Sequence, residues 1–291
     1  MRLVLFTALA MLAFAGNSLL CRHALTATAI DPASFATLRI VSGAIALLLI
    51  VGLRDRALPR AGSWTSALAL AVYAIAFSFA YASLTAATGA LVLFGAVQVT
   101  MIAYGRWRGE RFSAPQAIGF VVALAGLVGL MLPGLAAPPL TASALMIAAG
   151  IAWGAYTVLG KGAGEPLAVN AGNFARAAAF AALASLATIS HLDLDRAGVV
   201  DAVLSGALTS GVGYAIWYAA LRDLDVTRAA VSQLSVPVIA ALGGIALLGE
   251  APTLRLALAS IAILGGIALV VVPRRAQLAP PRPDGDQTVP M

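Results

Sequence analysis

Aromatic side chains recur at helical spacing in three apolar segments of the chain. Residues three or four apart share one face of a helix, so each segment presents its rings in one direction. Such a face offers stacking surfaces to a ring-bearing or amphipathic ligand. Ordinary helix packing or an aromatic belt at a membrane surface gives the same pattern, and the belt suits Tyr81 because it lies near a helix end. The residues are Tyr73, Phe77 and Tyr81, then Trp153 and Tyr156, then Tyr214, Trp217 and Tyr218.

Amide side chains interrupt the apolar segments. An amide facing lipid would leave its donors and acceptors unmet at a cost of several kcal/mol, so these groups must face protein or a water-filled cavity. Hydrogen bonds between helices, worth about 1 kcal/mol each, are the alternative to a cavity. We expect Asn17 and Gln98 to face a cavity, and the sequence leaves both readings open for Gln233. The amides considered are Asn17, Gln98, Asn173 and Gln233.

Two arginines, Arg39 and Arg176, fall inside segments expected to be helical. Snorkelling of the long side chain to an interface accounts for Arg39. Arg176 lies deeper, where a charge is costly without a partner, so it is expected to bind a helix end or a substrate carboxylate. Because the two arginines occupy matching positions in the two halves of the chain, a shared structural role is favoured over substrate binding.

Pro237 lies inside an expected helix, where it removes one backbone hydrogen bond and should produce a kink. Gly243 and Gly244 follow one to two turns later and add deformability. These three residues form a candidate hinge for gating.

Little in the sequence resembles a catalytic or metal centre. The histidines are His23 and His191, and the single cysteine is Cys21, which excludes disulfides within the chain and cysteine metal clusters. We therefore expect no cofactor, no metal and no enzyme activity. An intramembrane enzyme is the least favoured alternative because it would need a nucleophile–base pair, a carboxylate pair or metal ligands within the bilayer.

The elements that position these residues must be membrane helices. Of the 291 residues 10% are charged, whereas a soluble domain has about a quarter. Residues 61–105 and 112–160 contain no charged side chain, and at ~1.5 Å per residue each run is more than twice the ~30 Å hydrocarbon thickness. The predicted class is an all-α membrane protein with ten transmembrane helices, at about 3–22, 33–53, 64–84, 88–105, 114–132, 141–160, 167–190, 198–219, 227–248 and 254–272.

The distribution of Lys and Arg predicts the orientation of these helices. With the N-terminus in the cytoplasm most basic residues also fall there, whereas Arg22, Arg196 and Arg255 fall outside. The net charge of +6 is then a consequence of topology, and no nucleic-acid partner is expected. Ten crossings return the C-terminus to the cytoplasm, where the Pro-rich residues 276–291 are expected to form a disordered tail.

The chain repeats one pattern. Residues 109–133 and 249–273 both begin with Gly-Glu and end at a proline. We expect two five-helix repeats, 1–137 and 138–275, and because five is odd they must enter the membrane from opposite sides as an inverted-topology repeat. Glu110 and Glu250 are expected to cap the helices at 114–132 and 254–272, where the positive end of the helix dipole favours a carboxylate.

The motifs "LLGEAPTL" (247–254), Gly265-Gly266, Trp153-Gly154 and "SVPVIAALGG" (235–244), with the duplication, resemble the EamA-type families of the drug/metabolite transporter superfamily. The resemblance covers residues 1–275 and is weaker in the first repeat, which lacks the Pro-Thr and Trp-Gly pairs. It implies metabolite transport, often export of amino acids, with exporters of aromatic amino acids of the YddG type as one possibility. It also implies that the fifth and tenth helices are peripheral.

The predicted function is alternating-access transport of small metabolites, foremost amino acids including aromatic ones, across a bacterial inner membrane. No Asp or Glu lies deep in an expected helix, which favours facilitated diffusion or exchange over proton coupling. The alternative substrates are phosphorylated or nucleotide-linked sugars, which would want several cations in the cavity. The partners expected are the substrate and the lipid bilayer. The helices at 114–132 and 254–272 offer a homodimer surface, and a monomer is equally acceptable.

Overall fold

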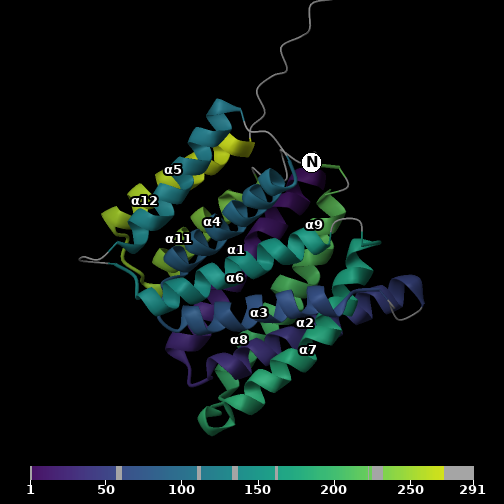
Figure 1. The fold of residues 1–291 in the computed structure, drawn as a ribbon. Helices are drawn as coiled ribbons and strands as arrows, with labels where there is room; N and C mark the ends of the chain where they lie inside the picture. Colours follow the sequence, from purple (N-terminus) through teal and green to yellow (C-terminus); the bar gives the residue numbers. More distant parts are fainter. Residues whose placement is uncertain are drawn as a thin grey trace, which may run out of the picture.

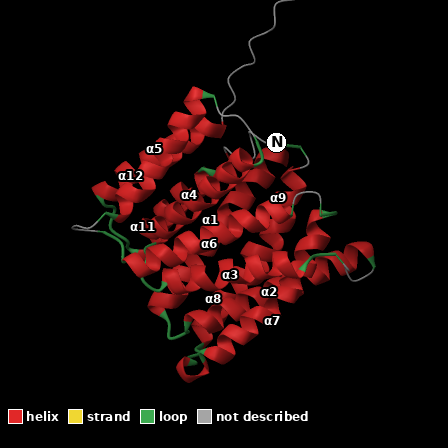
Figure 2. Cartoon of the chain, viewed as in Figure 1, coloured by secondary structure: helices red, strands yellow, loops and turns green. Residues whose placement is uncertain are grey.

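Helices joined by short loops make up the described part of the chain, which contains no β-strand (Figure 2). The computed structural model describes residues 2–56, 61–109, 113–132, 137–160, 163–221, 223–224 and 232–271. Within these ranges eight helices are long and apolar enough to cross a membrane, and two further apolar helices are shorter. The all-α prediction is confirmed. Glu110, the first residues of the helix predicted at 227–248, and the tail at 276–291 lie outside the described residues.

The helices begin within two residues of their predicted starts, except for the helix predicted at 227–248. Of that helix, residues 232 and 233 are helical and α11 begins at Ser235, while residues 227–231 lie outside the described part. The long helices of the first half are α1 (Arg2–Ala27), α2 (Pro32–Asp55), α3 (Trp64–Tyr81), α4 (Ala86–Trp107) and α5 (Ala114–Met131). The second half contains α6 (Leu140–Leu159), α7 (Pro166–Ala187), η1 (Ile189–His191), α8 (Arg196–Val203), η2 (Leu204–Val212), α9 (Gly213–Leu221), α11 (Ser235–Leu248) and α12 (Leu254–Val271).

Local capping chemistry explains why the starts were predictable. The Asp31 carboxylate accepts hydrogen bonds from the backbone N–H groups of Ala33 and Ser34, and proline occupies the first position of α2. Glu165 caps α7 in the same way, again directly before a proline. Helix α1 continues to Ala27, beyond its predicted end at residue 22.

The segment predicted as one helix at 198–219 consists of α8, the π-helical η2 and α9. In η2 the hydroxyls of Thr209 and Ser210 both donate to the carbonyl of Ser205, at 2.6 and 3.0 Å. Gly206 lies against α2, so close that a Cβ atom there would collide with the carbonyl oxygen of Arg39. Because π-helical turns are rare, the sequence pattern predicted an ordinary α-helix here. When such turns do occur, they are frequently found at functional sites.

Helices from the two halves pack in pairs. Helices α5 and α12 lie side by side at one edge of the bundle, and α2, α7 and α8 lie at the opposite edge (Figure 1). Gly119 and Gly266 allow the backbones of α5 and α12 to approach each other closely. Helix α2 packs on α7, α3 on α6, and α4 on both α6 and α11, while α1 contacts η2, α9 and α11. Each half therefore packs mainly on the other half.

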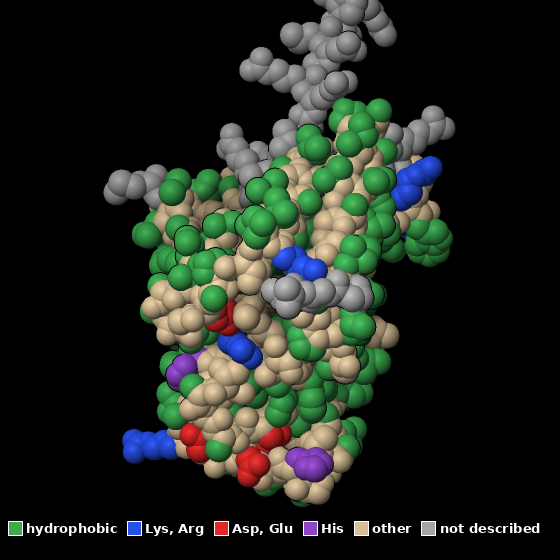
Figure 3. Space-filling model, turned by 90° about the vertical axis from the view of Figure 1, so that its left-hand side faces the viewer, with side chains coloured by type: hydrophobic (Ala, Val, Ile, Leu, Met, Phe, Trp, Pro, Cys, Tyr) green, Lys and Arg blue, Asp and Glu red, His purple; other side chains and the backbone are tan. Residues whose placement is uncertain are grey.

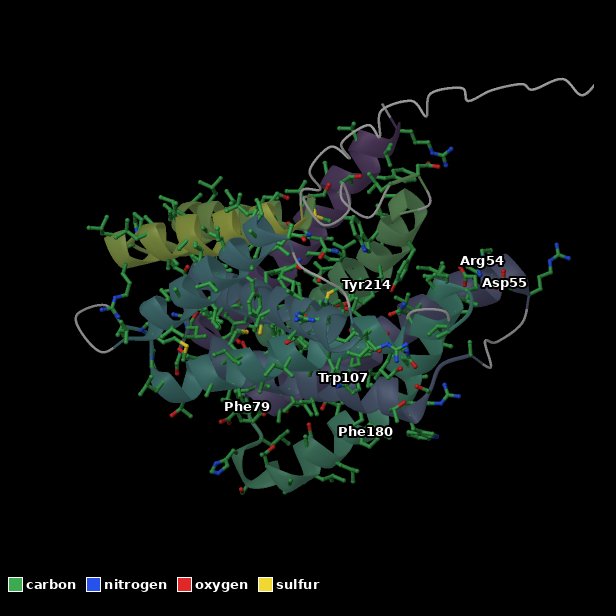
Figure 4. All side chains as sticks on the ribbon, turned by 45° about the horizontal axis from the view of Figure 1, so that its top comes forward. Arg54, Asp55, Phe79, Trp107, Phe180 and Tyr214 are labelled. Carbon is green, nitrogen blue, oxygen red and sulfur yellow. The ribbon has the colours of Figure 1, made fainter. Side chains whose placement is uncertain are left out.

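The two ends of the bundle differ in charge. The end that we call the acidic end contains residues 28–31, 82–85, 188–195 and 249–253, and Asp and Glu side chains gather on the middle and lower part of the face in Figure 3. The opposite end, the basic end, includes Arg54 and Asp55, at the far end of α2 in Figure 4. There Arg54 contacts Glu165 at 3.1 Å, and its hydrogen bonds hold the pKa of the Glu165 carboxyl below its usual range.

Replacing Gly206 with alanine should lower the melting temperature of the detergent-solubilised protein. The added methyl group meets the α2 backbone, and overpacking of this kind costs about 1–3 kcal/mol. Gly52→Ala is the matched control because nothing lies within 4 Å of a Cβ atom at that position on α2. Equal melting temperatures for the two variants would contradict the close approach of η2 to α2.

Candidate functional site

Aromatic side chains from five helices form one connected cluster inside the bundle. The Tyr73 ring lies 4.7 Å from that of Trp153, which lies 5.6 Å from that of Tyr214. Trp153 is half-buried, whereas Tyr73 and Tyr214 are buried. All of the aromatic residues singled out in the sequence belong to this cluster, together with two that were not. The cluster, called the aromatic cluster below, is Phe14, Tyr73, Phe77, Tyr81, Trp153, Tyr156, Phe174, Tyr214, Trp217 and Tyr218.

Phe14 and Phe174 were missed because only segments with several rings were considered. Phe14 lies three residues before Asn17 on α1, and it contacts the rings of both Tyr214 and Trp217 at 5.8 and 5.9 Å. Phe174 lies four residues after Asn170 on α7 and contacts Tyr214 at 5.9 Å. The same three-or-four spacing, measured from the amides instead of the rings, identifies both residues.

A polar network surrounds the hydroxyl group of Tyr73. Arg39 donates to this oxygen through Nη2 at 2.8 Å, and Asn17 donates to it through Nδ2 at 3.4 Å. The Oδ1 atom of Asn17 accepts from the hydroxyl of Ser205 at 2.6 Å, so η2 holds the amide in place. Asn17 was expected to face a cavity, and the contacts observed here are hydrogen bonds between helices, the alternative named for it.

A second network surrounds the hydroxyl of Tyr156. Tyr156 donates to the Oδ1 atom of Asn170, and the Nδ2 atom of Asn170 donates to the Tyr218 hydroxyl at 2.7 Å. Asn173 donates to the Tyr156 hydroxyl at 3.3 Å and accepts from the backbone N–H of Ser63 at 2.8 Å. Asn170 was not singled out in the sequence, although it lies on the same helix face as Asn173 and Phe174.

Arg39 and Arg176 have different environments, and their contacts give no support to the predicted shared structural role. Arg39 is 2% exposed, which also excludes snorkelling, and its guanidinium lies 5.0 and 4.8 Å from the ring centres of Tyr73 and Phe77. Arg176 instead donates to the carbonyls of Ala61 and Gly172, both at 2.9 Å, next to the loop that precedes α3. The side-chain atom Nη1 of Arg39 is buried and has no hydrogen-bond partner.

The remaining predicted residues lie around this centre. Gln98 is buried in α4 and Gln233 is half-buried before α11, and no ring contact or hydrogen bond between described residues joins either of them to the aromatic cluster. Pro237 is the third residue of α11, and because residues 225–231 lie outside the described part of the chain, its predicted position well inside a helix stays a prediction. Gly243 accommodates the side chain of Leu19, and Gly244 accommodates a carboxylate oxygen of the glutamate described next.

Glu250 does not cap the helix predicted at 254–272. Its two carboxylate oxygens accept from the backbone N–H of Ala86 at 2.8 and 3.0 Å, so it caps the first turn of α4. Thr253 caps α12 instead, accepting from Leu256 N at 3.1 Å. A cap residue bonds amides two or three positions ahead, and Glu250 is too far from Leu254 for that geometry. Glu250 does lie at the positive end of a helix dipole, as predicted, but the helix is α4 and not α12.

Arg22 extends this contact at the acidic end. Its Nε atom lies 3.4 Å from Glu250, and Nη1 donates to the carbonyl of Tyr81 at 3.0 Å. Tyr81 is fully buried beneath this turn and donates to the Ala86 carbonyl at 3.3 Å, so the aromatic-belt interpretation of Tyr81 is wrong. One carboxylate thus joins α1, the α3–α4 turn and the α11–α12 loop.

A second polar contact lies near the acidic end. The Nδ1 atom of His23 lies 2.6 Å from a carboxylate oxygen of Asp201, which joins α1 to α8. Asp201 is 9% exposed, so it is more enclosed than its position near a helix start suggested. Within the described residues no group of three or more His, Cys, Asp or Glu side chains could hold a metal ion.

A cavity of about 530 Å³ lies between α5 and α12, away from the aromatic cluster. Its lining is apolar except for Arg255, which donates to the carbonyl of Leu132 at the end of α5. This peripheral cavity contains none of the residues singled out for substrate binding.

Comparison with known proteins agrees with this architecture. The chain matches the EamA-like transporter family over residues 1–132 and again over 140–272. It is 57% identical over 279 residues to an uncharacterised protein of Pseudomonas aeruginosa, with 96% of this chain and 97% of that protein covered. It is 27% identical over 264 residues to an uncharacterised transporter of Archaeoglobus fulgidus, covering 85% and 90%. A crystal structure of a protein at 22% identity shares the fold, with a TM-score of 0.67 over 91% of this chain and 96% of the other.

These findings define a multi-pass membrane protein with a transporter fold. The chain belongs to the EamA-like transporter family, whose members are membrane transporters of small molecules.

Arg22 and Glu250 should be energetically coupled. In a double-mutant cycle of Arg22→Gln and Glu250→Gln, read from melting temperatures, we expect a coupling of about 1 kcal/mol, because each side chain loses its partner when the other is replaced. A cycle of Arg255→Gln with Glu250→Gln is the control and should be additive, since Arg255 bonds α5 carbonyls instead. Coupling between Arg255 and Glu250, with additivity between Arg22 and Glu250, would instead place Glu250 at the start of α12.

Proposed function

We propose that the chain transports amino acids, including aromatic ones, by alternating access around the aromatic cluster. The observation that carries the proposal is the composition of that cluster: rings contributed by α1 and α3 of the first half meet rings contributed by α6, α7 and α9 of the second. Movement of one half against the other would change the surroundings of this one site. A ring or branched side chain can stack on such surfaces in either arrangement.

An inverted repeat would suit alternating access, and two observations support it. Two segments of similar length match the same family, and the most extensive helix pairs are preserved when each helix is exchanged with the helix five positions along, counting α8, η2 and α9 as one. For example, α1 packs on η2 and α9 as α6 packs on α3. Ten membrane crossings with both termini in the cytoplasm and the acidic end outside would agree with the distribution of Lys and Arg, in a bacterial inner membrane.

Contacts at the two ends would form the gates. Opening the acidic end requires separation of Arg22 from Glu250 and of His23 from Asp201, whereas opening the basic end requires separation of Arg54 from Glu165. Pro237 lies in the first turn of α11, and Gly243 and Gly244 lie toward its C-terminal end, which leads to Glu250. We propose that these three residues make α11 a hinge. The exposed faces of α5 and α12 would accommodate a second copy, and transport does not require one.

A counterflow panel in proteoliposomes tests the substrate class. We expect exchange of phenylalanine and tryptophan to exceed that of a nucleobase or a sugar phosphate. Tyr214→Ala should reduce exchange about tenfold because it removes ring contacts from the centre of the aromatic cluster. Phe180→Ala is the control, since Phe180 contacts Trp64 at the side of α7 (Figure 4), and it should exchange normally. Preference for the sugar phosphate would support the alternative substrate class.

Transport should be independent of an imposed pH gradient. The buried carboxylate Asp201 is paired with His23 near the acidic end and is not part of the two networks around Tyr73 and Tyr156. We expect the same initial exchange rate with and without a gradient, and the rate of Asp201→Asn should be equally insensitive to the gradient. Accumulation against a concentration gradient driven by protons, abolished by Asp201→Asn, would replace facilitated exchange with proton coupling.

A further inference from the structure

We infer that Arg39 binds the carboxylate group of the transported molecule. This inference rests on the proposed function and adds to it a chemical requirement, a single negative charge close to an aromatic or apolar group. The sequence alone favoured a structural role for Arg39, and the environment of its side chain supports a binding role instead.

Arg39 is a buried cation with unused hydrogen-bonding capacity. The residue lies two turns into α2, its side chain is 2% exposed, and its Nη1 atom has no partner although it is buried. Groups of this kind are rare in folded proteins because desolvating a donor without replacing its hydrogen bond is unfavourable. In an apolar membrane interior such a residue is a functional-site candidate by default.

Among the described residues the charge of Arg39 also has no counter-ion. The ion pairs between described residues join Arg22 to Glu250, His23 to Asp201, and Arg54 to Asp55 and Glu165, and none of them includes Arg39. The Tyr73 hydroxyl and two aromatic rings are its neighbours. These neutral groups reduce the free-energy cost of burying the guanidinium charge, and an anionic ligand would offset the rest of that cost.

The two donors around Tyr73 show where such an anion would sit. Arg39 Nη2 and Asn17 Nδ2 converge on one oxygen atom, the Tyr73 hydroxyl, from α2 and α1. Ser205 fixes the amide of Asn17 so that its Nδ2 remains directed to this point. A carboxylate oxygen is the same kind of acceptor and carries charge, so it can take a place beside the hydroxyl and engage Nη1 with its second oxygen.

The number of cations favours a carboxylate over a phosphate. Arg176, the other arginine singled out in the sequence as lying inside a helix, already donates to two backbone carbonyls near the basic end. One guanidinium balances the single charge of a carboxylate, whereas a phosphate monoester carries about −1.5 to −2 at neutral pH. The neighbouring rings of Phe77 and Trp153 would contact the group attached to the carboxylate.

Matched ligands that differ only in the carboxylate test this inference. Isothermal titration calorimetry of the full chain in detergent would compare phenylalanine with phenylalanine amide and phenylacetate with phenylacetamide. We expect wild type to prefer each acid about ten- to a hundredfold, the range for a hydrogen bond to a charged group. Arg39→Gln should remove the preference while leaving the amides within about twofold, and Arg39→Lys should retain part of it. Arg196→Gln, at an exposed position, is the control.

Melting temperatures without ligand separate binding from a structural role. Because Arg39→Gln removes an unbalanced buried charge, we expect its melting temperature not to fall below that of wild type. A fall in stability together with equal weakening of acids and amides would assign Arg39 to structure and overturn the inference. So would an acid preference that survives Arg39→Gln, or a wild type that prefers neither acid. If Arg39→Gln does not fold, the wild-type preference and its change in Arg39→Lys decide the question.

Failure of the inference differs from failure of the proposed function. Normal counterflow of phenylalanine by Arg39→Gln would leave amino-acid transport standing and remove Arg39 from the site. An Arg39-dependent preference for phenylacetate without counterflow of any amino acid would retain the carboxylate site and reject amino acids as the substrate.

Discussion

Inside a hydrocarbon layer a polar group finds no water, so each donor and acceptor must be satisfied by the protein or by its ligand. This constraint organises the interior of the molecule. The amides of Asn17, Asn170 and Asn173 all bond to tyrosine hydroxyls, and these hydroxyls come from other helices. Because every such bond crosses between helices, the polar groups that are costly in lipid also determine which helices meet at the centre. The aromatic cluster lies at the same place because it covers these networks with apolar surface.

Local and long-range interactions differ in how far they could be predicted. Helix starts follow from residues within three positions of each other, as with Asp31 before α2, and these predictions were accurate. The partner of Glu250 could not be predicted, since a carboxylate at the end of α11 can reach either the next helix in sequence or a neighbour in space, and the neighbour is 164 residues away. The π-helical turn was missed for a related reason: it depends on the contact of Gly206 with α2, which periodicity within one segment does not contain.

The site itself was partly predictable. Ring spacing identified the face of α3 that turns inward, because Tyr73 and Phe77 lie four residues apart and both are buried. The amides indicated how far along the helices the site lies, and Asn17 lies where α1, α3 and η2 meet. What the sequence lacked was the pairing of elements. Without the pairing, Phe14 and Phe174 looked like ordinary core residues. Spacing along the chain also cannot show that Arg39 lies among aromatic rings while Arg176 bonds to backbone carbonyls.

That distinction between Arg39 and Arg176 is the most informative asymmetry in the bundle. Arg39 is the eighth residue of α2 and Arg176 the eleventh of α7. Arg176 reaches the carbonyl of Ala61 near the basic end, whereas Arg39 lies among rings and has one nitrogen without a partner among the described residues. Carbonyl oxygens of Ala61 and Gly172 satisfy Arg176, whereas the one acceptor that Arg39 meets among the described residues is the Tyr73 hydroxyl. The missing acceptor at the centre is therefore the one that a small anion entering between the two halves would supply.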